Sequence, residues 1–244
     1  DVKKISEIMH ALAEKHQKKP APIIIDAAGA FMFIGVMKNN PKYNGNLPEI
    51  SFNIPNIEAI IGDPHKQPLP YSCGLLMLKN MTLANYSDFR TIGSAKYLDM
   101  DEETKDTTAA FATIPTSRSG TNAFVIWAYL AYLGITGLRE QKEKIWTLVQ
   151  DFKEYIQQHP ELELVYEPQT QIVSFRYKGS GEDNIQIYRR IKTSDKDFCY
   201  ISEDIDMLAR TQEEKEEAKN TNKYAGLFVT IMEHNTQQHM HAVK

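Results

Sequence analysis

The spacing of hydrophobic residues predicts a helix and then short strands in the first third of the chain. Near the start, hydrophobic side chains recur every three or four positions, which predicts a helix with one apolar stripe that ends before Pro20. Three short apolar runs follow, at residues 23–25, 57–61 and 74–78. The first of them is typical of a strand that is buried on both faces, as in a parallel sheet covered by helices. This order of elements favours part of an α/β sheet over a helical bundle.

A different pattern begins near the middle of the chain. Residues 122–133 are strongly apolar and predict a helix, and a second helix carries five hydrophobic residues on one face: Ile145, Leu148, Val149, Phe152 and Ile156. Trp127 and Trp146 are expected to pack in the core of these helices. Apolar and polar residues then alternate in three segments, which predicts half-buried antiparallel strands around residues 162–166, 173–177 and 227–231.

These elements group into two expected domains. We predict an α/β domain over residues 1–135 and a small α+β domain over residues 136–244, with a helix around residues 185–191 between its strands. Residues 86–108 are polar and lack periodic apolar positions, which predicts a loop of the kind that often covers a site.

Composition and charge narrow the classes of function. The chain has 244 residues, 42% of them hydrophobic and 25% charged, which is typical of a globular protein. The formal charge of −4 argues against non-specific binding to nucleic acid. The longest apolar run, residues 123–133, is shorter than the roughly 20 residues that span a bilayer, so we expect no membrane span. Cys73 and Cys199 lie far apart in apolar settings, which favours buried free thiols in a reducing, cytoplasmic compartment.

Two polar groups stand directly after predicted strands. Asp26 follows the apolar run at residues 23–25, and we expect it to be partly buried at the edge where α/β sheets bind ligands. The local sequence also fits a purely structural role for Asp26, in which its side chain caps the N-terminus of a helix that follows. Lys66 ends the segment DPHK at residues 63–66, which by itself is typical of a turn with a solvated lysine. Together, an acid and a lysine at neighbouring strand ends are what a pyridoxal phosphate site needs.

Three motifs occur in order along the chain. They are IDAA at residues 25–28, DPHK at residues 63–66 followed by PYSCG at residues 70–74, and TSRSG at residues 116–120 ahead of an apolar helix. With these motifs the sequence resembles the fold-type I, pyridoxal-phosphate-dependent group II amino-acid decarboxylases. The resemblance implies that the first domain is the C-terminal part of a cofactor-binding large domain, with a mostly parallel sheet and helices. It also implies decarboxylation of an L-amino acid with pyridoxal 5'-phosphate as cofactor.

The resemblance implies a role for several motif residues. Lys66 would carry the cofactor as an internal aldimine, Asp26 would pair with its pyridine nitrogen, and Ala28 would lie beside it. His65 would lie near the cofactor phosphate or the carboxylate that leaves. Tyr97, in the polar loop, would protonate the substrate Cα after carbon dioxide has left.

Two further positions bear on substrate and assembly. Arg118 resembles the family arginine that braces the mobile loop or reaches across a dimer interface. Phe228 stands where many relatives carry an arginine that grips the substrate α-carboxylate. The absence of that arginine keeps open an aldehyde lyase of the sphingosine-phosphate lyase type. A catalytically silent scaffold subunit that keeps the fold but not the cofactor is a separate alternative.

The resemblance also implies partners. The family places a substantial segment before the helix that opens this chain, so we expect a homodimer, or a heteromer with an N-terminal chain of the same enzyme. Three histidines near the end of the chain lack acidic or cysteine partners at ligand spacing, so we expect no metal site there: His234, His239 and His241.

Overall fold

The computed structural model describes most of the chain, and it divides into two compact units. The first unit comprises residues 1–31 and 48–132, and the second comprises residues 32–47 and 133–244. The pattern of hydrophobic residues does not predict that residues 32–47 belong to the second unit. The structure describes residues 1–67, 69, 73–80, 119–193, 201–204, 209–221 and 224–231.

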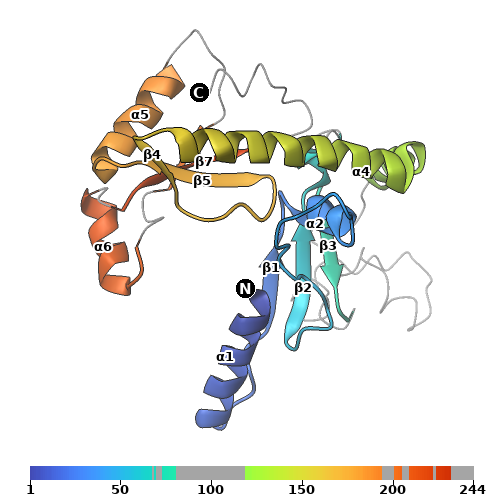
Figure 1. Ribbon diagram of the computed structural model, residues 1–244. Coiled ribbons are helices and arrows are strands. Elements are labelled where there is room, and N and C mark those ends of the chain that lie inside the picture. Colours follow the sequence, from blue (N-terminus) through green and yellow to red (C-terminus); the bar gives the residue numbers. More distant parts are fainter. Residues whose placement is uncertain are drawn as a thin grey trace, which may run out of the picture. The chain divides into compact units, whose positions relative to one another are not determined.

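The first unit contains a helix and a three-stranded sheet. Helix α1 spans Val2–Lys15 and ends before Pro20, as predicted. The strands are β1 (Ile23–Asp26), β2 (Ile57–Gly62) and β3 (Leu75–Leu78), in the order β1-β2-β3 (Figure 1). Strands β1 and β2 are parallel, whereas β3 runs antiparallel to β2. The three predicted strands are therefore confirmed, and they form one mixed sheet.

The two faces of this sheet differ in burial. One face packs in a core formed by Ala27, Ile54, Ile57 and Ile60. On the other face Ile24 of β1 is 64% exposed and Leu76 of β3 is 61% exposed. The prediction that residues 23–25 are buried on both faces is therefore wrong for the described chain. A run of apolar residues indicates that the strand favours a buried position. Both faces of the strand are buried only if a layer of other residues packs on each face of the sheet.

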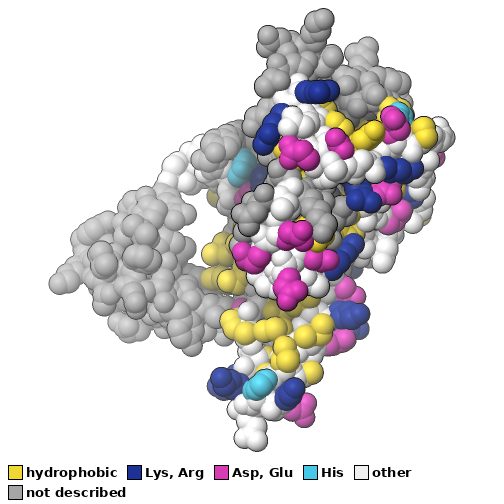
Figure 2. Space-filling model, turned by 90° about the vertical axis from the view of Figure 1, so that its left-hand side faces the viewer, with side chains coloured by type: hydrophobic (Ala, Val, Ile, Leu, Met, Phe, Trp, Pro, Cys, Tyr) yellow, Lys and Arg dark blue, Asp and Glu magenta, His cyan; other side chains and the backbone are white. Residues whose placement is uncertain are grey.

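Helix α1 also leaves hydrophobic residues exposed. Its N-terminus is capped by Asp1, whose side chain accepts a hydrogen bond from the Lys4 backbone N–H at 3.1 Å. Its buried residues are Ser6 and Ala13, and the Ser6 hydroxyl donates to the Pro55 carbonyl at 2.8 Å. Most of the predicted apolar stripe is exposed, and its exposed members are Ile5, Ile8 and Leu12. Figure 2 shows hydrophobic side chains along this helix toward the bottom of the view.

The two helices predicted in the middle of the chain form one long element, α4, over Thr121–Gln158. It is interrupted at Gly134, whose φ of 58° and ψ of −177° lie outside the helical region and favour glycine. By length and composition alone α4 could cross a membrane, a criterion that core helices of soluble proteins also meet. Trp146 is buried as predicted, but Trp127 is 64% exposed, so its predicted core position is wrong in the described chain.

The second unit contains an antiparallel sheet covered by the later part of α4. Its strands follow the order β4-β5-β7-β6, and each neighbouring pair is antiparallel. This confirms the three predicted strands, and the five hydrophobic residues predicted on one helix face are all buried. Phe152 packs edge-on against Phe175, with ring centroids 5.4 Å apart. The elements are β4 (Leu162–Leu164), β5 (Ile172–Tyr177), α5 (Gly181–Thr193), β6 (Ile201–Asp204), α6 (Gln212–Thr221) and β7 (Gly226–Thr230).

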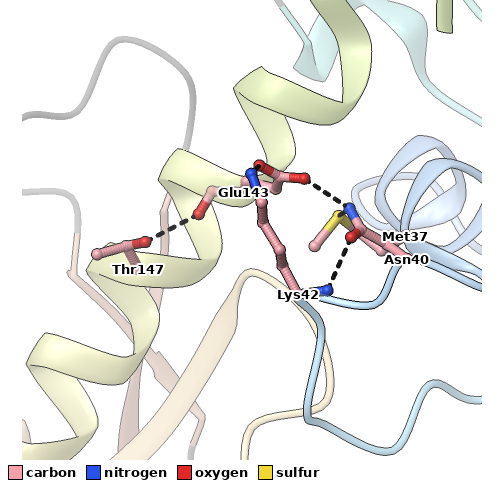
Figure 3. A network of polar contacts seen from close by, with 5 residues as sticks. All are labelled: Met37, Asn40, Lys42, Glu143 and Thr147. Atoms are coloured by element: carbon pink, nitrogen blue, oxygen red, sulfur yellow. Dashed lines mark hydrogen bonds and ion pairs between the residues drawn. The ribbon is translucent and has the colours of Figure 1, made fainter. Parts of the chain in front are cut away.

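Contacts with α4 explain why residues 32–47 belong to the second unit. Helix α2 (Phe31–Met37) leads into a loop that is tied to α4 by polar side chains. Asn40 Nδ2 donates to Glu143 Oε1 at 3.0 Å, and Lys42 Nζ contacts Glu143 Oε2 at 2.6 Å (Figure 3). The indole N–H of Trp146 donates to Asn44 Oδ1 at 2.9 Å. The Lys42 and Asn40 hydrogen bonds lower the pKa of Glu143, which therefore stays charged.

Candidate active site

The carboxyl ends of β1 and β2 meet at one edge of the sheet because the two strands are parallel. Backbone hydrogen bonds continue beyond the strands and join the segments that follow them. Ala27 N–H donates to the Ile61 carbonyl at 3.0 Å, and Asp63 N–H donates to the Ala28 carbonyl at 3.1 Å. The IDAA and DPHK motifs are therefore held against each other by this hydrogen-bonded edge.

Asp26 lies at the end of β1, paired in register with Ile61 of β2. Its Oδ1 accepts a hydrogen bond from the Ala28 backbone N–H at 3.0 Å, two residues ahead, as in an Asx turn. Asp26 is exposed, so the prediction of partial burial is wrong in the described chain. The reason is that its side chain projects from the same face of β1 as Ile24, which the described residues leave open.

A single turn of 3₁₀ helix, η1 (Pro64–Lys66), carries Lys66 at the end of β2. The Lys66 N–H donates to the Asp63 carbonyl at 2.9 Å and closes this turn. Side chains three residues apart are eclipsed on a 3₁₀ helix, and Lys66 Nζ accordingly lies 3.0 Å from Asp63 Oδ2. Asp63 was predicted only as part of a turn, because its spacing of three residues from Lys66 brings the two side chains together only where the segment is helical.

His65 anchors the same turn to the start of β3. Its Nδ1 lies 2.8 Å from the Cys73 carbonyl oxygen, and its backbone N–H donates to the same oxygen at 3.3 Å. A carbonyl only accepts, so Nδ1 carries the proton in this contact, and Nε2 lies 3.9 Å from Asp63 Oδ2. Cys73 is a buried free thiol, as predicted, and burial raises its pKa.

Gly62 allows the chain to leave β2 in close contact with a neighbouring ring. A Cβ built at this position would lie 2.7 Å from Cδ1 of Phe31. No side chain larger than a hydrogen fits there without displacement of the ring, so glycine sets how closely Phe31 packs beside the turn that carries Lys66.

The remaining predicted site residues are Ala28, Tyr97, Arg118 and Phe228, and the structure describes two of them. Tyr97 and Arg118 lie outside the residues that the structure describes. Ala28 is half-buried in the segment after β1. Phe228 is half-buried in β7 of the second unit, where it pairs in register with Ser174 and Ser202. Within the first unit, backbone hydrogen bonds thus join the segment that carries Asp26 and Ala28 to the segment that carries His65 and Lys66.

The chemistry of these side chains fits pyridoxal phosphate. Lys66 supplies an amine that can bond to an aldehyde, and Asp26 supplies an exposed carboxylate that can accept a hydrogen bond from a protonated ring nitrogen. The face that carries Asp26 also bears exposed apolar side chains from β1 and β3, against which an aromatic ring can pack. These residues would hold the cofactor at the carboxyl edge of the sheet.

Solved structures with the same fold are found among decarboxylases and a related lyase. The chain is similar to the tryptophan decarboxylase of Catharanthus roseus, with a TM-score of 0.63 and 18% identity over 99% of this chain and 44% of that one. It is also similar to the sphingosine-1-phosphate lyase of Burkholderia pseudomallei, with a TM-score of 0.58 and 15% identity over 98% of this chain and 48% of that one. The chain therefore has part of the fold-type I α/β fold, as predicted.

Sequence comparison gives the family. The family described as "Pyridoxal-dependent decarboxylase conserved domain" matches residues 3–178, and the chain belongs to this family. A curated relative is the probable L-aspartate decarboxylase of Pyrococcus abyssi, 29% identical over 183 residues that cover 74% of this chain and 44% of that protein. The chain thus spans less than half the length of this relative.

Proposed function

We propose that this chain is part of a pyridoxal-phosphate-dependent lyase that decarboxylates an L-amino acid. The observation that carries the proposal is the edge shared by β1 and β2, where the segments bearing Asp26 and Lys66 are joined by backbone hydrogen bonds. Family membership supports the same conclusion, because the matched family is pyridoxal-dependent. L-aspartate is the substrate class that the name of the Pyrococcus abyssi relative suggests.

Each residue of the edge has a proposed task. Lys66 binds the cofactor aldehyde through Nζ, and Asp26 holds the proton on the cofactor ring nitrogen. His65, fixed by its bond to the Cys73 carbonyl, contacts the cofactor phosphate or the carboxylate that leaves, and Ala28 lies beside the ring. When bound, the cofactor supplies a ring that accepts electrons from the substrate Cα.

Two residues outside the described chain complete the proposal. Tyr97 would protonate the substrate Cα, and Arg118 would brace the loop or cross a dimer interface. The role of Tyr97 rests on its place in the polar loop that follows Lys66, and the role of Arg118 rests on the motif TSRSG at residues 116–120.

We further propose that the first unit packs against more protein of the same enzyme, within a homodimer or with an N-terminal chain. Exposed hydrophobic residues on α1, β1 and β3 support this, because large apolar areas are normally covered in an assembled protein. A cytoplasmic location is part of the same proposal.

An aldehyde lyase is the second candidate. Phe228 supports it, because a hydrophobic side chain cannot form the paired hydrogen bonds by which an arginine grips a carboxylate. The structural similarity to the sphingosine-1-phosphate lyase of Burkholderia pseudomallei is compatible with this reading. A catalytically silent scaffold subunit is the third.

The test is covalent capture of the cofactor. The protein, with any partner that purifies with it, is incubated with pyridoxal 5'-phosphate, reduced with borohydride and mapped by peptide mass spectrometry. We expect the pyridoxyl group on Lys66, its loss in K66R and its retention in K79R, a matched variant of an exposed lysine beside β3. Absence of label on Lys66 would favour the scaffold, and carbon dioxide release from a panel of amino acids would separate decarboxylase from aldehyde lyase.

A further inference from the structure

Two side chains, one on each side of Lys66 in the sequence, anchor the turn η1 to the segments beside it. His65 Nδ1 donates to the Cys73 carbonyl at 2.8 Å, just before β3. Gln67 Nε2 donates to the Gly29 carbonyl at 3.4 Å, in the segment that follows β1. Because β2 lies between β1 and β3, the lysine is held between anchors to both neighbouring segments. The proposed function uses the first of these anchor residues, whereas it gives Gln67 no role.

Gln67 is buried, and its main chain is fixed by hydrogen bonds. Only 4% of the residue is exposed. Its backbone N–H donates to the Pro64 carbonyl at 2.9 Å, and its own carbonyl accepts from the Leu69 N–H at 2.6 Å. A buried amide without hydrogen bonds would carry a desolvation cost, so the bond to Gly29 is favoured over an open state. Because its main chain is held in this way, the side chain fixes the turn that carries Lys66 relative to Gly29.

The bond from Gln67 extends a series of hydrogen bonds between the two motif segments. Three consecutive residues that follow β1 take part: the main chain at Ala27, Ala28 and Gly29 is bonded, in that order, to residues 61, 63 and 67. Lys66 lies between the last two of these attachments. Without the bond from Gln67, this series would end before the lysine.

We propose that Gln67 is a positioning residue, whose side-chain amide fixes the turn η1 against Gly29 and so sets the separation of Lys66 from Asp26. The aldehyde carbon and the ring nitrogen of pyridoxal phosphate are held at a fixed distance by one aromatic ring, so both residues reach them only if their spacing is right. Small displacements of groups that bind one ligand strongly reduce the efficiency of a site. The benefit for cofactor binding rests on the proposed function, whereas the fixing of the turn does not.

The test removes the hydrogen-bond donor and keeps the size of the side chain. Q67M is similar in length to the wild type but donates nothing, and Q67E has nearly the same shape with a carboxylate in place of the amide. S6A is the matched control, because the buried Ser6 also donates a side-chain hydrogen bond to a backbone carbonyl of the first unit, that of Pro55 at 2.8 Å. For the protein with any partner that purifies with it, absorbance titration gives the dissociation constant of pyridoxal 5'-phosphate. Peptide mass spectrometry gives the hydrogen exchange of the cofactor-free protein.

We expect both variants of Gln67 to weaken cofactor binding by about 2- to 12-fold, the range for loss of one hydrogen bond. In the cofactor-free protein, exchange in the peptide that spans residues 62–67 should accelerate by a similar factor, while residues 57–61 of β2 keep the wild-type rate. S6A should match the wild type in both measurements. A merely structural role would give S6A the same loss of affinity, or would speed exchange throughout the first unit. Either result would overturn the proposal, as would wild-type affinity or wild-type exchange in Q67M.

Cofactor capture distinguishes failure of this inference from failure of the proposed function. If borohydride places the pyridoxyl group on Lys66 while Q67M keeps wild-type affinity and exchange, the positioning role of Gln67 is wrong and the proposed function stands. If Q67M speeds exchange at residues 62–67 while Lys66 captures no cofactor in the assembled protein, Gln67 does fix the turn and the proposed function is wrong.

Discussion

Replacement of Gly62 by alanine is expected to destabilise the unit that carries the candidate site. The new methyl group would lie 2.7–2.9 Å from three ring carbons of Phe31, well inside van der Waals contact. The ring cannot simply move away, because Phe31 packs against the hydrophobic cluster of the first unit, whose buried members are Ala27, Ile54, Ile57 and Ile60. Either the ring, the end of β2 or the start of α2 must shift.

The expected loss of stability in G62A follows from measurements on other proteins in which an extra methyl group was added to a packed interior. Extra methyl groups in packed interiors cost about 1–3 kcal/mol. With a urea m value of about 2 kcal/mol per molar, the unfolding midpoint of G62A should fall by about 0.5–1.5 M. Equilibrium unfolding in urea, followed by circular dichroism, measures this shift directly, and equal m values in the two proteins would show that stability alone has changed.

Two further variants make the test specific to the contact. Gly62 ends β2 and Gly29 lies shortly after β1, but a Cβ at Gly29 meets no atom within 4 Å, so G29A should stay within about 0.5 kcal/mol of the wild type. Phe31→Leu should recover part of the loss in the G62A background, because a smaller side chain relieves the clash. Equal midpoints for G62A and G29A, or strictly additive effects of G62A and F31L, would refute the packing argument.

Two other predictions concern the second unit. Phe152 is almost fully buried and packs edge-on against Phe175, so Phe152→Ala should lower the free energy of unfolding by about 3–5 kcal/mol, measured by the same urea titration. Hydrogen bonds from the Ser180 hydroxyl and backbone N–H lower the pKa of Asp183 at the start of α5. Asp183 therefore stabilises the fold above its unfolded pKa of about 3.9, and this contribution is lost as pH falls through the lower folded pKa. The melting temperature of D183N should accordingly vary less than that of the wild type between pH 3 and 6; parallel curves would contradict the assignment.

Elements that depend on neighbours in the chain were predictable from the sequence. The face of α4 that includes Val149 and Phe152 follows from a spacing of three and four residues, and the alternation at β5 and β7 follows from the period of a strand. The segment DPHK predicted a turn because proline and aspartate favour one locally. Such patterns are set by backbone geometry over a few residues, so they appear without knowledge of the rest of the fold.

Contacts between distant residues were not predictable in the same way. Glu143 lies 103 residues from Asn40, and no local pattern indicates that their side chains meet. The exposure of Asp26 likewise depends on whether any layer covers that face of β1, which the hydrophobicity of β1 itself does not determine. The ion pair of Asp63 with Lys66 needed the 3₁₀ geometry, since the same spacing in an extended loop separates the two groups.

The sequence by itself therefore determined the types of the elements, the strand-end position of the acid and the lysine, and the family to which the motifs point. Only the tertiary structure decided which faces are covered, which loop joins which unit, and which carboxylate holds Lys66. Local propensity acts through a few consecutive residues, whereas burial and side-chain pairing depend on what the rest of the chain brings alongside.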